Sequence, residues 1–553
     1  MLERLPLPEG ATEITVDSIE DNDGRDDQLT LREAILLAVG ELTVGALNPG
    51  EADNVVGPGG PGSHGPGADS IDVIVFDPDV FGGSDAVIEL TGPLPSLATG
   101  GDIVDGGDSV VTLDGGAQEN TEVGAINVGG VGAGFSISSD SNTIRGLRIY
   151  NFSEAAIAIL GVDTSASENI IGPGNVISAN HFAVYATGSM AAGNRIIGNF
   201  LGTDPSGTVA MGNNHGVWMT FGPHDNTIGG DSEDERNIIS GNKMTGITLW
   251  SAHSNRVIGN YIGTDVTGTK SLGSPRGMRI DVGGSYNIIG GTTPGERNIF
   301  SGNSIGIEIS GRVETTGNRI IGNYIGLDAT GQAAVGNGVG INIEEGDDGE
   351  DVFPPGPTEN VVGGLEPGER NIISGNGQAG IFIRNASSNH IVGNYIGTDP
   401  EGKRSILNGT GVILVDRAKE NVVGPANVIS GNLREGVIVM GIENFGNSVI
   451  GNIIGANAED EGPLGNGQNG ILIQDPSKDN VIGGSGDDGN IIAHNDGHGI
   501  MLEKTSGNAI SGNSIFDNAG ESIETVKRGD IGLTLFMITE MSPLLRVPPA
   551  PGA

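Results

Sequence analysis

The stretch NRIIGNFLGTD, which begins at Asn194, decides the fold because the same phrase returns at nearly constant spacing. It recurs as NRVIGNYIGTD at Asn255, as NRIIGNYIGLD at Asn318, as NHIVGNYIGTD at Asn389, and in degraded form at Asn447 and Asn508. The intervals are 61, 63, 71, 58 and 61 residues. Repeats of this kind bury their apolar sides only against their neighbours, so the chain is predicted to be a stacked solenoid.

Each repeat is expected to contain two coils. A second phrase, of the type NIIGGTTPGERNIFSGN at Asn287, lies between the first ones. A four-residue strand that begins with glycine recurs beside both phrases, and 30 residues separate GVWM at Gly216 from GITL at Gly246. Each such interval holds three short strands of β-branched and aliphatic residues, separated by Asn, Gly, Asp and Pro. No stretch of this region has the apolar spacing of a helix.

Strands at this density, without crossover helices, complete their hydrogen bonds only by pairing with the coils above and below. This arrangement is a parallel β-helix. With strands about 4.8 Å apart, about thirteen coils between Phe135 and Phe516 predict a rod about 60 Å long. The 98 glycines supply positive φ angles at the corners. The Asn of each SGN or IGN step is expected to stack on its counterparts in an internal ladder.

The NxIxGN and GIxI strings resemble the right-handed parallel β-helix repeats of the pectin-lyase-like superfamily, and the resemblance covers roughly residues 125 to 520. It implies an all-β fold, a single right-handed parallel β-helix of about thirteen coils with three strands per coil. Proteins with this repeat include lyases, hydrolases, phage tailspikes and adhesins, so the resemblance implies a fold more specifically than an activity.

The N-terminal stretch ITVDSIEDNDGRDDQLTLREAILLAV resembles the segment with a Cys-Ser-Leu-Arg-Glu-Ala signature that opens many bacterial surface β-helix proteins. Leu29 and Thr30 replace the Cys and Ser, whereas residues 31–34 match. Thr30 and Glu33 form a capping box before an apolar run, which predicts a short helix. We expect this helix to cover the open hydrophobic end of the solenoid.

The expected organisation follows from these segments. Residues 1–47 form an N-terminal segment with the capping helix, 48–70 a Gly- and Pro-rich loop, 71–134 the first irregular coils, 135–528 the β-helix repeats, and 529–553 a C-terminal tail or cap.

Composition limits the partners. With 70 acidic and 27 basic residues, the formal charge of -43 excludes nucleic acid as a partner. No stretch approaches the roughly 20 apolar residues of a membrane span, so no membrane insertion is expected. The chain has no cysteine, and no cofactor is required, although calcium is a candidate. The N-terminus shows no apolar core of a secretory signal, whereas the resemblance implies an extracellular or cell-surface protein.

Candidate binding residues come from the glycine-led strands. Their second and fourth residues are expected to point inward, which leaves the third and fifth facing solvent. Both tryptophans of the chain lie on the outer face. Aromatic rings beside carboxylates and arginines are suited to binding a polysaccharide. The predicted binding residues are Trp218, Trp250, Asn342, Glu344, Phe382 and Arg384.

Asp281 and Glu308 are the candidate catalytic carboxylates, with Arg279 beside them. They lie on adjacent coils and are offset by two residues, which predicts a backbone separation of about 8 Å, close to the carboxyl spacing of inverting glycosidases. One would act as the general acid and the other would activate water. The alternative is an ordinary solvated sheet face.

Two acidic features bear on calcium. The insertion EEGDDGEDVFPPGP brings carboxylates close together, and the candidate ligands are Glu344, Glu345, Asp347, Asp348 and Asp351, with Glu350 as a sixth. The alternative is a flexible acidic loop. By contrast, the recurring Asp of the TD step returns only every second coil, too far apart to share an ion, and is expected to begin Asx turns.

Farther along the same face the outward residues become apolar. They are Ile413, Val415, Ile438, Met440, Leu472 and Met501. A stripe of this length is unlikely to face water, so a cover is expected. The apolar C-terminal segment from Ile531 is one candidate cover, and a second copy of the chain, in a homo-oligomer, is the other.

Three classes of function remain. The first is an extracellular or surface protein that binds a polysaccharide or other glycan without chemistry. The second is a polysaccharide lyase or inverting glycoside hydrolase that uses Asp281 and Glu308. The Arg-x-Lys motif of polygalacturonases of this fold is absent here. The third is a structural stalk without a ligand.

Overall fold

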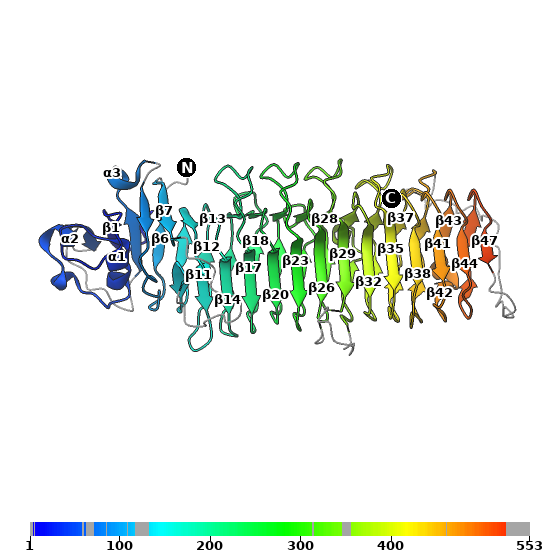
Figure 1. Cartoon of the computed structure of the whole chain (residues 1–553), viewed down its shortest axis with the longest axis horizontal. Coiled ribbons are helices and arrows are strands. Elements are labelled where there is room, and N and C mark those ends of the chain that lie inside the picture. Colours follow the sequence, from blue (N-terminus) through cyan, green and yellow to red (C-terminus); the bar gives the residue numbers. More distant parts are fainter. Residues whose placement is uncertain are drawn as a thin grey trace, which may run out of the picture. The chain divides into compact units, whose positions relative to one another are not determined.

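The computed structural model describes residues 4, 6–57, 60–61, 71–83, 86–107, 109–116, 132–311, 315–345, 356–459 and 462–526. The chain divides into two compact units, Met1–Glu308 and Ile309–Ala553. Within each unit, successive coils contribute one strand to each of three parallel sheets (Figure 1). The predicted right-handed parallel β-helix fold is confirmed.

In the first unit, the chain from β6 onward passes through sheet 1, sheet 2 and sheet 3 in that order in each coil. Sheet 1 contains β1 (Thr12–Val16), β4 (Asp72–Phe76), β6 (Ile103–Asp105), β9 (Thr143–Arg145), β12 (Ile170–Ile171), β15 (Arg195–Ile196), β18 (Thr227–Gly229), β21 (Arg256–Ile258) and β24 (Ile288–Gly290). Sheet 2 contains β5 (Val87–Glu89), β7 (Val111–Asp114), β10 (Leu147–Tyr150), β13 (Val176–Ser178), β16 (Phe200–Leu201), β19 (Ile238–Ile239), β22 (Tyr261–Ile262) and β25 (Ile299–Phe300). Sheet 3 contains β8 (Phe135–Ile137), β11 (Ala155–Leu160), β14 (Phe182–Thr187), β17 (His215–Thr220), β20 (Thr245–Trp250) and β23 (Arg276–Asp281).

The border between the units falls within β26 (Ile305–Ser310). In the second unit, sheet 1 contains β27 (Arg319–Ile321), β30 (Val361–Gly363), β33 (His390–Val392), β36 (Val422–Val423), β39 (Ser448–Val449), β42 (Val481–Gly483) and β45 (Ala509–Ser511). Sheet 2 contains β28 (Tyr324–Ile325), β31 (Ile372–Ile373), β34 (Tyr395–Ile396), β37 (Val428–Ile429), β40 (Ile453–Ile454), β43 (Ile491–Ala493) and β46 (Ser514–Phe516). Sheet 3 contains β29 (Val339–Glu344), β32 (Ala379–Arg384), β35 (Thr410–Val415), β38 (Val437–Met440), β41 (Ile471–Gln474), β44 (Ile500–Glu503) and β47 (Ile523–Val526).

The remaining elements are short. They are α1 (Leu31–Ala38), α2 (Pro49–Asp53), α3 (Pro78–Phe81), the 3-10 turns η1 (Val44–Ala46), η2 (Pro367–Glu369) and η3 (Gly486–Asp488), and the strands β2 (Val55–Gly57) and β3 (Gly60–Pro61). The prediction of a loop over 48–70 is wrong for residues 49–57. Asn48 and Glu51 form a second capping box that starts α2, and β2 then pairs antiparallel with β1. In the described ranges, no helix combines the length and apolar character needed to span a membrane.

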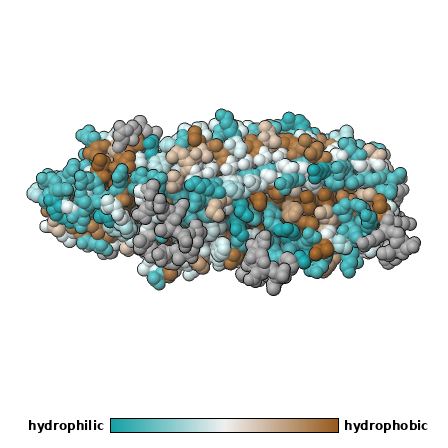
Figure 2. Space-filling view, in the orientation of Figure 1, coloured by the Kyte–Doolittle hydropathy of each residue, from teal (hydrophilic) through white to brown (hydrophobic). Residues whose placement is uncertain are grey.

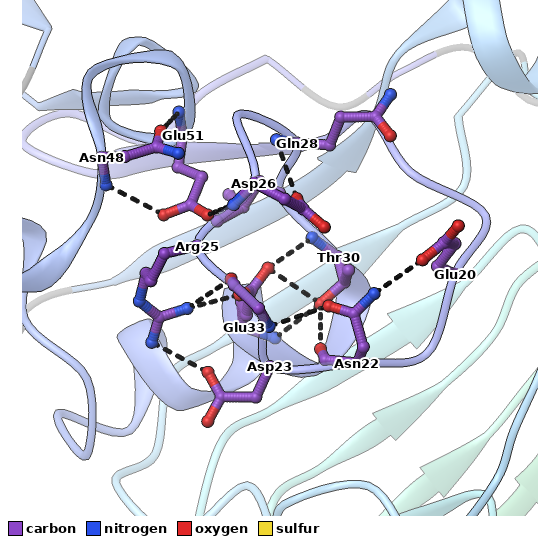
Figure 3. A network of polar contacts seen from close by, with 12 residues as sticks. Glu20, Asn22, Asp23, Arg25, Asp26, Gln28, Thr30, Glu33, Asn48 and Glu51 are labelled. Atoms are coloured by element: carbon purple, nitrogen blue, oxygen red, sulfur yellow. Dashed lines mark hydrogen bonds and ion pairs between the residues drawn. The ribbon is translucent and has the colours of Figure 1, made fainter.

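The helix predicted after Thr30 is present as α1, and it packs against β1 and β4. Figure 3 shows its polar N-terminus, where the Thr30 side chain accepts from the Glu33 backbone N–H at 3.2 Å and the Thr30 backbone N–H donates to Glu33 at 3.0 Å. Glu33 is fully buried, and burial raises its pKa. Arg25 compensates this buried carboxyl with an ion pair of 2.5 Å. The role of α1 as an end cover stays a prediction.

Asparagine ladders line the interior at three corners of the coils. In the first unit, the side-chain amide of Asn194 donates to Asn226 at 2.9 Å, Asn199 donates to Asn237 at 3.0 Å, and Asn213 donates to Asn242 at 3.1 Å. The same bonds continue in the second unit, where the Asn360 amide donates to Asn389 at 3.0 Å. Buried amides therefore satisfy one another coil after coil. The SGN and IGN asparagines do line the interior, but the prediction of a single ladder is wrong. The IGN asparagine Asn199 bonds to Asn237, and the SGN asparagine Asn242 belongs to a separate ladder with Asn213. The ladder formed by the first Asn of each NxIxGN string is an addition.

In the first coils of the first unit, aspartates replace asparagines in the ladder that contains Asn142. Asp102 occupies the next position before Asn142, and its backbone N–H donates to the Asn142 side-chain oxygen at 3.2 Å. Asp72 precedes Asp102, and both carboxyl groups are fully buried. Burial raises the pKa of each to about 7, and for Asp102 the neighbouring Asp72 adds to the effect. Acids thus stand where the later coils use neutral amides.

Candidate functional site

The candidate site is the outer face of sheet 3 in the first unit. Parallel pairing aligns Tyr185 with Trp218, Trp218 with Thr248, and Thr248 with Arg279. The alternate residues of β17 and β20, such as Val217 and Met219, are completely buried in the core. The predicted inward and outward alternation is therefore correct, since successive side chains of a strand point to opposite faces.

The two tryptophans stack on each other from neighbouring coils. The ring centroids of Trp218 and Trp250 are 5.9 Å apart, and their planes differ by 26°. Both side chains are half-buried. His215 meets the edge of Trp218 at 4.6 Å, and the Phe182 ring centre lies 5.6 Å from it. The tryptophans thus belong to one aromatic cluster and keep part of their surface exposed to solvent.

Sequence reasoning missed Phe182, Tyr185 and His215 as members of this cluster. The strand FAVYAT at residues 182–187 carries Ala183 where β17 and β20 carry Gly216 and Gly246, so a search for glycine-led strands passes over it. His215 lies one position before the glycine of its strand. An alignment of all coils at the 30-residue spacing, made without requiring a glycine, would have found all three residues.

Among the residues that the structure describes, the buried Trp218 indole N–H and the buried Thr248 hydroxyl have no hydrogen-bond partner. Trp218 and Thr248 are aligned between β17 and β20 in the register of the sheet. An unpaired buried polar group costs about 1–3 kcal/mol.

His215 adds a neutral polar group to the cluster. Its ring nitrogen Nδ1 lies 2.7 Å from the Thr245 hydroxyl. Burial lowers the His215 pKa to about 3, and the nearby His181 contributes. The imidazole is therefore uncharged near neutral pH and stacks against Phe182 with ring centroids 5.3 Å apart.

The predicted catalytic residues form a charged cluster beside the tryptophans. Arg279 lies 2.6 Å from Asp281 and 3.6 Å from Glu308, and Arg276, which was not predicted, pairs with Glu308. Trp250 and Asp281 are aligned in the sheet. The structure thus brings Trp218, Trp250, Arg279, Asp281 and Glu308 together on one face.

The prediction that the third and fifth strand residues face solvent is wrong for several positions. Asp281 and Glu308 are only 3% and 4% exposed, and Thr248 is fully buried. Their side chains leave the outer face, but longer side chains on neighbouring strands, including Arg276 and Arg279, lie against them. Both carboxylates are thus held in ion pairs instead of facing open water.

The other predicted binding residues belong to the second unit. Asn342 pairs with Phe382 and Glu344 with Arg384 in the sheet register. The Asn342 amide donates to Glu344 at 2.8 Å, and Arg384 lies 2.8 Å from Glu344. Asn342 is buried, contrary to the prediction, whereas Phe382 is half-buried and Arg384 is exposed. Asn342 and Arg384 thus both bind the Glu344 carboxylate.

The calcium prediction falls mostly outside the described residues, as Asp347, Asp348, Glu350 and Asp351 do. Of the remaining two, Glu344 pairs with Arg384, and Glu345 accepts from Asn385. Across the described ranges, no group of three or more His, Cys, Asp or Glu side chains is placed to hold a metal ion. The calcium site stays a prediction.

The recurring charged motifs hold the coils together. The Asp204 carboxylate accepts the backbone N–H groups of Thr208 and Val209, four and five residues on, at 3.0 and 2.9 Å. These bonds close a wider loop than the bond two residues on that defines the predicted Asx turn. In the PGER-type phrases, Glu296 pairs with Arg256 at 2.7 Å, and Arg236 lies over the Tyr261 ring at 4.3 Å. These repeated charges therefore have structural roles and leave the sheet 3 face as the candidate site.

Comparison with known proteins adds similarity of fold alone. No family model matches the chain, and no curated protein matches it. Among solved structures, the chain is similar to the Dettilon tailspike protein, at 15% identity and a TM-score of 0.35, over 76% of this chain and 60% of that one. It is similar to the periplasmic alginate epimerase AlgG, at 11% identity and a TM-score of 0.32, over 71% and 76% of the two chains. It is also similar to PfbA, a surface adhesin of Streptococcus pneumoniae, at 10% identity and a TM-score of 0.33, over 83% and 85%. The chain thus spans less than two thirds of the tailspike.

Proposed function

We propose that the protein binds a carbohydrate polymer on the outer face of sheet 3 in the first unit, outside the cell. The observation that carries the proposal is the stacked pair Trp218 and Trp250, which presents aromatic faces next to Arg279 and its carboxylate partners. Aromatic faces suit the C–H faces of sugar rings, and the charged groups suit their hydroxyls.

A neutral polymer fits the charges of this face better than an acidic one. Arg276 and Arg279 are matched by Asp281 and Glu308, so the cluster carries no excess positive charge to attract an anion. The whole chain has a formal charge of -43. That charge repels polyanions, and the repulsion is strongest at low salt.

Binding without chemistry is preferred to hydrolysis because both candidate carboxylates are buried in ion pairs. A general base needs access to a water molecule, and a general acid needs access to the leaving oxygen. A lyase or hydrolase that uses Asp281 and Glu308, with Arg279, is the second candidate, since the structure does bring the three groups together. A structural stalk without a ligand is the third candidate.

The test is affinity electrophoresis of the full chain in gels that contain hydroxyethyl cellulose, dextran, polygalacturonate or alginate. We expect retardation by a neutral polymer, no release of reducing ends or unsaturated products, and loss of retardation in Trp218→Ala. Tyr286→Ala is the matched control, because this ring is 64% exposed and lies outside sheet 3. Equal retardation of wild type and Trp218→Ala would refute the proposed face, and product release would favour the enzyme.

A further inference from the structure

The second unit carries an apolar stripe on the outer face of its sheet 3. Ile413 is aligned with Ile438, Ile438 with Leu472, and Leu472 with Met501. Val415 and Met440 form a second aligned pair beside them. The stripe therefore crosses four consecutive strands, β35, β38, β41 and β44. Figure 2 shows hydrophobic atoms gathered over this part of the sheet.

The stripe is less exposed than its sequence predicts, but the residues that the structure describes leave part of it open. Val415 and Leu472 are 7% and 9% exposed, because adjacent apolar side chains shield each other. Ile413, Ile438, Met440 and Met501 remain half-buried. The inward residues of the same strands, such as Leu414 and Val439, are fully buried and already form the core. The stripe is thus a second apolar surface that contributes nothing to the core beneath it.

We propose that residues 531–545 of the same chain cover this stripe. The last described strand, β47, belongs to the same sheet and pairs with β44, which carries Met501. The described part of the chain therefore ends one strand beyond the stripe. From β47 back to β35 is four strand spacings, about 19 Å, whereas the 27 residues after Val526 reach up to about 90 Å when extended.

The sequence of this segment suits the stripe. IGLTLFMITEMSPLL, which begins at Ile531 and lies outside the described residues, contains one charged residue, Glu540, in fifteen. In its first part, apolar residues at 531, 533, 535 and 537 alternate along the chain, which gives an extended segment one continuous apolar face. A tethered segment also acts at a high effective concentration, of millimolar order, so it outcompetes a second copy of the protein at ordinary concentrations.

The absence of cysteine makes a direct test available. In the double variant Met440→Cys with Leu535→Cys, we expect an intramolecular disulfide under mild oxidation, independent of protein concentration. Glu401→Cys with Leu535→Cys is the control, because Glu401 is exposed in the same unit but lies outside sheet 3. It should form no bond. Disulfide-linked dimers through Met440→Cys would show that a second copy occupies the stripe and would overturn the proposal.

A fluorescence measurement keeps the proposal testable if the disulfide geometry is unfavourable. An environment-sensitive dye on Met440→Cys should emit at shorter wavelength in the full chain than in the same chain carrying Leu533→Asp and Leu535→Asp. Circular dichroism should show equal strand content in both proteins. Equal dye emission in the two proteins would overturn the proposal.

Discussion

Trp218 and Trp250 lie on adjacent coils of sheet 3 and stack with ring centroids 5.9 Å apart. They are the two tryptophans of the 553-residue chain. Parallel pairing aligns Trp218 with Thr248 and Trp250 with Asp281, so the pair is offset by two residues along the strands. This offset places one ring beside the aromatic cluster and the other beside the charged cluster.

Removing either ring should weaken binding of a neutral polysaccharide. Stacking on an aromatic side chain is worth about 1 kcal/mol beyond the area it buries, so we expect Trp250→Ala to lower affinity about tenfold once the lost contact area is included. Isothermal titration calorimetry with the polymer that retards wild type measures the change. Trp250→Phe should retain most of the affinity, whereas an unchanged Trp250→Ala would place the binding surface elsewhere.

Asp281→Asn separates binding from catalysis. The variant removes the charge that pairs with Arg279 at 2.6 Å, in a buried position, so we expect a loss of about 1–3 kcal/mol in unfolding free energy. Polysaccharide turnover should be absent in both the wild type and the variant. Chromatography of polymer digests checks this, and a wild-type activity that falls at least a hundredfold in Asp281→Asn would establish the enzyme instead.

The buried acids of the first coils should make the stability of the first unit depend on pH. The folded pKa values of Asp72 and Asp102, about 7, lie above the value of about 4 expected in the unfolded chain. Their contribution is therefore complete below about pH 4 and is lost as pH rises through about 7. Thermal unfolding at pH 5 and pH 8 should show a lower melting temperature at pH 8.

Asp102→Asn is the matched variant for that effect. It restores the amide found at Asn142 and the later ladder positions, so the melting temperature should change less between pH 5 and pH 8 than in wild type. Hydrogen exchange should place the difference in β4, β6 and β9. A pH dependence that is identical in wild type and variant would show that Asp102 does not titrate in this range.

The asparagine ladder should matter more to stability than the repeated surface ion pairs. Asn226 receives a bond from Asn194 and donates to Asn255 at 3.0 Å inside the core, so Asn226→Ala leaves buried partners unsatisfied. We expect a cost of about 2–4 kcal/mol. Arg256→Ala, which removes the exposed partner of the ion pair with Glu296 and leaves the bonds between Glu296 and Thr293 in place, should cost less than about 1 kcal/mol. Denaturant unfolding compares the two, and similar costs would contradict the ladder's importance.

The coil, the three sheets and the inward residues could be predicted because they repeat. A period of about 30 residues identifies the coil. The two-residue alternation along each strand predicts whether a side chain points into the core or out of it. The capping box of Thr30 and Glu33 was equally readable, because it depends on residues three apart. These features require only local rules applied many times.

The state of the candidate site could not be predicted in the same way. Whether Asp281 is open to water depends on Arg279 and on the positions of other long side chains from adjacent strands. The repeat period of the sequence does not predict those positions. The aromatic cluster was missed because Ala183 interrupts the glycine pattern just where Phe182 and Tyr185 join it. The residues of the candidate site therefore include positions, such as Phe182 and Tyr185, that depart from the repeat pattern.

Intrinsic tryptophan fluorescence tests the proposed binding face most directly, because Trp218 and Trp250 account for all tryptophan emission. Titration with the neutral polymer that retards the protein should shift or quench this emission along a saturable curve, and Trp218→Phe should change the amplitude. Emission that stays constant while the polymer binds would contradict binding at this face.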